Sequence, residues 1–181
     1  MENQNTPIKA GLNAGLILGI LSVVITFIVY FVSPSTLVSG IFGIAMLVVF
    51  FGLLIYFGIQ YRTSLGGFME FGKAFQYSFI ALLVAGIISQ IGNALLYNLI
   101  DPALPGVLAE QTIENTMEMM EKFGAADSIS SEQLDKMRQD AEANYTFSGQ
   151  LKALGIASII YAIIALIIGA IIKKRDKSLD F

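Results

Sequence analysis

Residues 86–97 combine small, amide and hydroxyl side chains within a run that is otherwise apolar. Gly86, Gln90, Asn93 and Tyr97 are spaced i, i+4, i+7 and i+11, with Ser89 beside them, so a helix would place them on one face. Such a face could line a small polar pocket or path. It could also hold helices together through side-chain hydrogen bonds, each worth roughly 0.6 to 2 kcal/mol in a membrane. We favour this structural role, because the apolar runs lack the ionisable group that proton-coupled transport usually needs.

The chain offers little else with which to do chemistry. It has no His and no Cys, which removes thiol chemistry, His-based catalytic triads and the usual zinc or haem sites. Tyr97 and Asp101 are the only plausible reactive pair near the outer surface, and they have no base or metal to assist them. A row of glutamates and methionines at 110–121 resembles no calcium loop and is read as a solvated acidic face. We therefore predict no enzyme activity, no cofactor and no metal site. The sequence also lacks a basic, aromatic face for nucleic acid, so we predict no nucleic-acid partner.

The elements that must position the polar face are four apolar blocks. The chain has 181 residues, 55% hydrophobic and 14% charged, and the apolar residues gather at 10–32, 37–60, 75–100 and 151–172. Because about 20 helical residues cross the hydrocarbon layer, each block is long enough to span a membrane. The first block reads as a retained span rather than a cleaved signal. We predict a single all-α membrane domain over residues 1–181, with four transmembrane helices.

Basic residues predict the orientation, since Lys and Arg near span ends are held on the cytoplasmic side. Segment 101–150 carries ten acidic and three basic residues, a net charge of −7. We predict a multi-pass membrane protein with both termini in the cytoplasm and segment 101–150 outside. The basic residues expected on the cytoplasmic side are Lys9, Arg62, Lys73, Lys173, Lys174, Arg175 and Lys177.

Residues 61–74 are expected to form a cytoplasmic interfacial turn. Gly66 and Gly67 break the second helix, and a new helix is predicted to begin at about Phe68. Its aromatic residues would share one face and its polar residues, including Lys73, another. We favour a simple return into the membrane over a docking site for a cytoplasmic or lipid partner. The aromatic face comprises Phe68, Phe71, Phe75 and Phe79.

Small residues in two spans predict close helix packing. Gly11, Gly15 and Gly19 form a double G-x-x-x-G pattern in the first span. It could close a contact within one chain or form a homo-oligomer. A second small-residue stripe in the fourth span comprises Gly155, Ser158, Ala162, Ala165 and Gly169.

The acidic insert at 101–150 reads as two amphipathic helices, Leu104 to Phe123 and Ser131 to Phe147. Gly124 suits the end of the first, and Ser130 with Gln133 suits a capping box for the second. We predict an extracytoplasmic helical hairpin between the third and fourth spans, lying over the outer mouth of the bundle.

Several of these motifs together resemble a known family. They are the glycine-rich first span, the G-G-x-x-x-F-G-K-A-F motif at 66–75, the Tyr97-x-x-Ile100-Asp101-Pro102 ending of the third span and the acidic insert. The pattern resembles small bacterial membrane proteins of the Bacteroidetes type, catalogued as domain of unknown function four-one-nine-nine. The resemblance implies an inner-membrane protein without assigned catalytic residues and a partner in envelope biosynthesis. We expect an accessory protein that binds a partner or membrane lipids, and keep as the alternative a small transporter or lipid-handling protein that uses the polar face.

Overall fold

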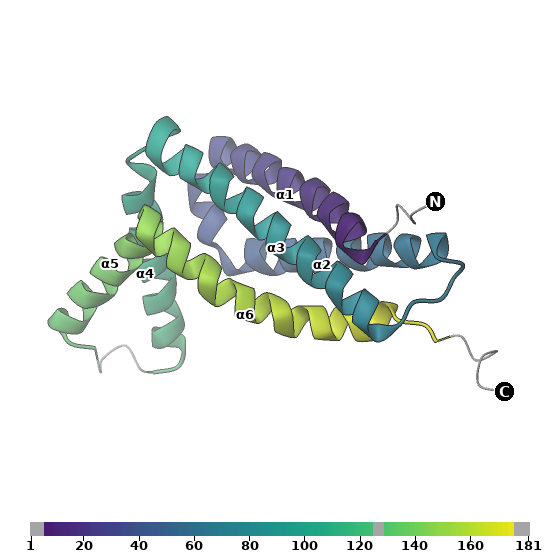
Figure 1. Ribbon diagram of the computed structural model, residues 1–181. Coiled ribbons are helices and arrows are strands. Elements are labelled where there is room, and N and C mark those ends of the chain that lie inside the picture. The colour runs from purple at the N-terminus through teal and green to yellow at the C-terminus, as the bar shows by residue number, and fades with distance from the viewer. Residues whose placement is uncertain (1–5, 125–128, 176–181) are drawn as a thin grey trace.

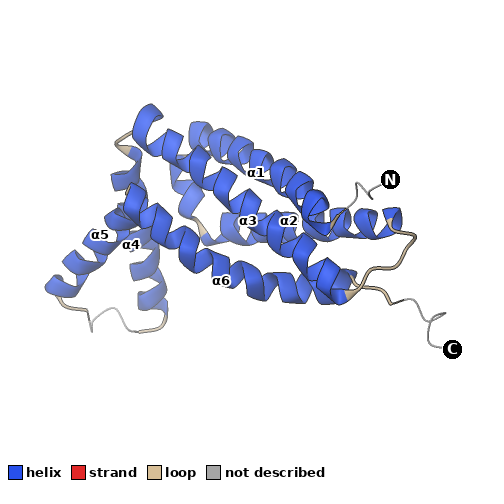
Figure 2. Ribbon diagram, in the orientation of Figure 1, coloured by secondary structure: helices blue, strands red, loops and turns tan. Residues whose placement is uncertain are grey.

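The computed structural model describes residues 6–124 and 129–175, and every regular element in them is a helix (Figures 1 and 2). Four helical stretches, α1, α2, α3 continued by η2, and α6, are long and apolar enough to cross a membrane. This result confirms the predicted all-α membrane fold. The elements are α1 (Pro7–Val32), the 3-10 helix η1 (Pro34–Val38), α2 (Gly40–Ser64), α3 (Phe71–Leu95), the π-helix η2 (Leu96–Ile100), α4 (Leu104–Lys122), α5 (Ser131–Tyr145) and α6 (Phe147–Ile172).

The ends of the spanning helices fall into two groups. The start of α1, the α2–α3 connection and the end of α6 lie at one end of the bundle, and α4 and α5 lie at the other (Figure 1). The described basic residues expected in the cytoplasm therefore share one end, whereas Lys177 lies outside the described residues. Which end faces the cytoplasm stays a prediction.

Helix α1 packs closely against α3 through its three regularly spaced glycines. A methyl group at Gly11 or Gly15 would come within 2.7 Å of a backbone carbonyl oxygen of α3, at Tyr77 and Ala81 respectively. At Gly19 it would come equally close, 2.7 Å, to the side chain of Ile88. The double glycine motif thus lies in a contact within the chain.

Helix α6 packs on another side of α3, also through small residues. Ala165 and Gly169 are buried, and a methyl group at Gly169 would lie 3.1 Å from the backbone nitrogen of Phe75. The earlier part of the predicted stripe does not pack closely on another helix. Gly155 faces open space, and the Ser158 hydroxyl donates to the Leu154 carbonyl of its own helix. Only the later half of the stripe forms a close seam.

Helix α2 is buried only in its second half. Leu54, Gly58 and Tyr61 are its buried residues. The Tyr77 hydroxyl of α3 donates to the Leu54 carbonyl at 3.1 Å, and the Tyr77 and Tyr61 rings stack at 5.7 Å. In contrast, no residue of α2 before Leu54 is buried, and a methyl group added at Gly52 would meet no atom of another helix within 4 Å.

The α2–α3 connection differs from the expected helical turn. Gly66 and Gly67 have φ near +88° and +89°, as a tight reversal requires, but α3 begins at Phe71 rather than at about Phe68. The residues between Gly67 and the start of α3 are extended rather than helical. The reason is that Met69 exchanges two backbone hydrogen bonds, of 2.8 and 2.9 Å, with Lys174, which follows α6. Phe68 therefore does not share a helical face with the later phenylalanines.

A second contact joins the same two segments. The Arg62 guanidinium donates to the Ile172 carbonyl at 2.9 Å, which satisfies a terminal carbonyl of α6 and places positive charge at its C-terminus. The Lys173 ammonium lies 5.6 Å from the ring centre of Phe71. Lys73 is exposed on the first turn of α3. These residues tie the end of α6 to the α2–α3 connection.

The acidic insert folds as α4 and α5, which pack through Ala109, Ile113 and Ala141. The predicted capping box at Ser130 and Gln133 is present at the start of α5. The helices end at Lys122 and Tyr145, slightly earlier than predicted.

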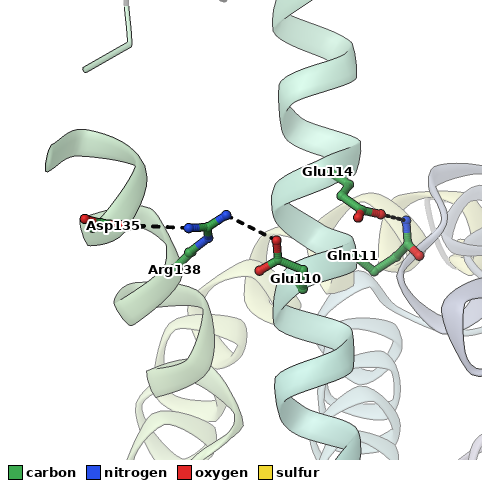
Figure 3. A network of polar contacts seen from close by, with 5 residues as sticks. All are labelled: Glu110, Gln111, Glu114, Asp135 and Arg138. Atoms are coloured by element: carbon green, nitrogen blue, oxygen red, sulfur yellow. Dashed lines mark hydrogen bonds and ion pairs between the residues drawn. The ribbon is translucent and has the colours of Figure 1, made fainter. Parts of the chain in front are cut away.

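Arg138 of α5 bridges the two helices of the insert. Its guanidinium lies 3.3 Å from Glu110 of α4 and 3.7 Å from Asp135 (Figure 3). The three side chains are between 44% and 70% exposed, so each pair contributes at most about 1 kcal/mol. The early turns of α4 pack on η1 and the end of α1, while the far ends of α4 and α5 point away from the bundle (Figure 1).

We predict that Gly15→Ala lowers the free energy of unfolding in mixed micelles by roughly 1 to 3 kcal/mol, since the new methyl group meets a backbone carbonyl that cannot rotate away. The matched control Gly52→Ala faces open space and should leave stability unchanged or raise it by up to about 1 kcal/mol. A Gly15→Ala protein of unchanged stability but lower oligomeric mass would instead place the glycines between two chains.

Candidate functional site

A cavity of about 430 Å³ lies between the first half of α2 and the helices α3 and α6. It is open to the surroundings rather than enclosed, and α2, α3 and α6 form its walls together with one residue of α1. The lining residues lie near the middle of these four helices, so the cavity sits at mid-depth of the predicted membrane. They are Ser22, Met46, Leu47, Phe50, Phe51, Leu82, Ala85, Gly86, Ser89, Gln90, Asn93, Leu154, Ala157, Tyr161 and Ile164.

The polar face predicted on the third span largely coincides with this cavity. Gly86, Ser89, Gln90 and Asn93 all belong to its lining. Tyr97 does not, because it lies one turn further on, where its ring packs edge-on against Tyr145 of α5 at 5.4 Å. The structure therefore brings four of the five residues together.

The polar residues of the cavity differ in their hydrogen bonding. The Gln90 amide nitrogen donates to the Gln150 carbonyl of α6 at 3.3 Å, which is a helix-to-helix contact of the structural kind. Within the described residues, the side chains of Ser22, Ser89, Asn93 and Tyr161 make no hydrogen bond.

These polar atoms are not sealed inside the protein. Among the described residues, no fully buried side-chain nitrogen or oxygen lacks a partner. The free hydroxyl and amide groups are therefore accessible at the surface, and their residues line the cavity. In an apolar setting, an unpaired polar group costs about 1 to 3 kcal/mol, so these groups favour an occupant that can hydrogen-bond.

Two polar residues of the cavity were not predicted from the sequence. Ser22 continues the face of Gly15 and Gly19 at i+7 and i+3, a spacing that could have placed it beside α3. Tyr161 leans over Gly86, where a methyl group would lie 2.8 Å from its hydroxyl oxygen. Gly86 thus provides the space that brings the Tyr161 ring to the cavity wall.

Tyr97 and Asp101, the pair considered for reactivity, both make structural contacts. Asp101 accepts hydrogen bonds from the backbone nitrogens of Ala103 and Leu104 at 3.1 Å, which satisfies two backbone donors at the start of α4. It also accepts one from the Tyr30 hydroxyl of α1 at 3.1 Å. Tyr97 packs on Tyr145 instead of approaching Asp101.

The four apolar helices and the cavity between them define a helical, multi-span membrane protein. The family model described as Protein of unknown function (DUF4199) matches residues 13–174, and the chain belongs to that family. No curated protein and no solved structure matches the chain.

We predict that Gln90→Leu and Asn93→Leu separate the structural and pocket roles of the polar face. In lipid-free detergent, Gln90→Leu should lower the free energy of unfolding by roughly 0.6 to 1.7 kcal/mol, because it removes a contact to α6. Asn93→Leu removes no hydrogen bond within the protein and should change stability by less than about 0.5 kcal/mol. Equal destabilisation by both variants would show that the whole face acts as structural contact.

Proposed function

We propose that this protein is a non-enzymatic lipid-binding protein of a bacterial cytoplasmic membrane, serving the cell envelope as an accessory component. The observation that carries the proposal is the cavity between α2, α3 and α6, whose free hydroxyl and amide groups lie among mostly apolar walls. Mostly apolar pockets of this volume with a few polar groups are typical of small-molecule binding sites.

Water alone is a poor occupant for such a space. An ordered water needs two to four polar partners, and the walls supplied by Met46, Phe50 and Phe51 offer none. A hydrocarbon chain would contact these walls, and an oxygen-bearing group on the same molecule would meet Ser89 and Asn93. One membrane amphiphile satisfies both parts of the cavity.

The non-enzymatic part of the proposal is supported by the roles of Tyr97 and Asp101. Both side chains are engaged in packing or hydrogen bonding, and neither lines the cavity. A small transporter that uses the cavity as part of a path is the second candidate. It would move a solute across sealed vesicles, whereas a binding protein would retain its ligand without flux.

We predict that one amphiphile co-purifies with the protein from its native membrane in mild detergent, enriched over its share of the membrane lipids. Ser89→Phe should remove this enrichment, because the ring would occupy the cavity. Leu95→Phe adds the same ring at a position that is 46% exposed and outside the cavity lining, and it should retain the ligand. Native mass spectrometry of the three proteins makes the comparison; equal lipid content in all three would contradict the proposal.

The proposed orientation has a test of its own, since the chain lacks cysteine. Glu70→Cys and Glu118→Cys place single thiols at exposed positions in the α2–α3 connection and on α4. With a membrane-impermeant maleimide on spheroplasts of the native host, we expect Glu118→Cys to react at once and Glu70→Cys only after lysis. The reverse pattern would mean that the termini face outward.

A further inference from the structure

The chemical class of the cavity's occupant follows from what lines it. No Asp, Glu, Lys or Arg belongs to the described lining, whose polar side chains are hydroxyls and amides. Ser22, Ser89 and Tyr161 can each donate and accept a hydrogen bond, and the Asn93 amide can do both as well. This set matches an uncharged hydroxyl or carbonyl group.

The described lining of the cavity contains no cationic side chain that could pair with an anionic headgroup. A phosphate or carboxylate at mid-depth of a membrane needs a cation or several strong donors, because an isolated charge there costs at least about 2.5 kcal/mol. The described basic residues expected on the cytoplasmic side lie at the far ends of the helices, at positions such as Arg62 and Lys173, and none lines the cavity. The cavity therefore disfavours anionic lipids, although they are common in bacterial membranes.

The remaining walls suit a hydrocarbon chain. Met46, Phe50 and Phe51 of α2 line the cavity, as do Leu82 of α3 and Ile164 of α6. The polar groups gather on the α1–α3 side, at Ser22, Ser89 and Asn93, and the bulky apolar groups on the α2 side. An occupant would thus lie with its oxygen-bearing part toward α3 and its chain along α2.

We propose that the site binds an uncharged lipid of the diacylglycerol type, whose hydroxyl or ester carbonyl groups hydrogen-bond with Asn93, Ser89 and Ser22. The inference rests on the proposed lipid-binding function and adds the headgroup class to it. The other polar residues keep separate roles, since Gln90 is bonded to α6.

The test compares dioleoyl diacylglycerol with dioleoyl phosphatidic acid, which differ only in the phosphate. The reporter is Ala157→Cys, a small replacement in the cavity wall of a chain without other cysteines, and the readout is its alkylation rate by a membrane-permeant maleimide. Leu95→Cys, which lies outside the lining, is the control and should react at the same rate with or without lipid. We expect diacylglycerol to protect Ala157→Cys at a concentration at least about tenfold lower than phosphatidic acid.

A second variant tests the polar contact itself. Adding Asn93→Leu to the reporter should weaken protection by diacylglycerol by roughly 3- to 20-fold. Equal or better protection by phosphatidic acid would overturn the headgroup assignment and leave lipid binding standing. Undiminished protection by diacylglycerol in the Asn93→Leu variant would also overturn it. Protection by neither lipid would overturn the proposed function as well.

Discussion

The close approach of α1 to the backbone of α3 is the contact on which the rest of the bundle depends. Three glycines one turn apart bring α1 within van der Waals reach of the carbonyl oxygens of Tyr77 and Ala81. In a membrane, where apolar side chains gain little by leaving lipid for protein, such intimate packing is a main source of helix association. With α1 on one side and the Gly169 seam of α6 on another, α3 becomes the central helix (Figure 1).

The cavity follows from how α2 is held. Its second half is anchored through Leu54, Gly58 and Tyr61, and η1 holds its first end near α4 through Val38. Between η1 and Leu54, the glycines of α2 face away from the bundle, and bulky side chains such as Phe50 and Phe51 line the cavity. These side chains prevent the close approach that α1 and α6 achieve. The space left beside the polar face of α3 is therefore a direct result of the packing.

Much of this fold was predictable from local sequence. The spans follow from the length of apolar runs, the capping box from Ser130 and Gln133, and the reversal from Gly66 and Gly67, because each depends on residues that are neighbours in the chain. The start of α3 was not predictable in the same way. It depends on the backbone pairing of Met69 with Lys174, more than a hundred positions away.

The candidate site was predictable only in part, for the same reason. Helical spacing identifies Gly86, Ser89, Gln90 and Asn93 as one face of α3. Whether that face meets another helix or a space depends on where α2 and α6 lie, and a single sequence does not contain that placement. The difference in hydrogen bonding between Gln90 and Asn93 likewise depends on the position of α6, because the acceptor for Gln90 lies on that helix.

The measurement that tests the central claim most directly is a nuclear Overhauser experiment on the Asn93 side-chain amide. The protein would be perdeuterated, back-exchanged at its amides and placed in nanodiscs of protonated native lipid extract. If a lipid occupies the cavity, the Asn93 amide protons will show cross-peaks to lipid protons, and these will be absent in the Ser89→Phe variant, whose ring extends into the cavity beside Asn93's helix face. Cross-peaks to water alone, or lipid cross-peaks that persist in the Ser89→Phe variant, would contradict lipid binding at this site.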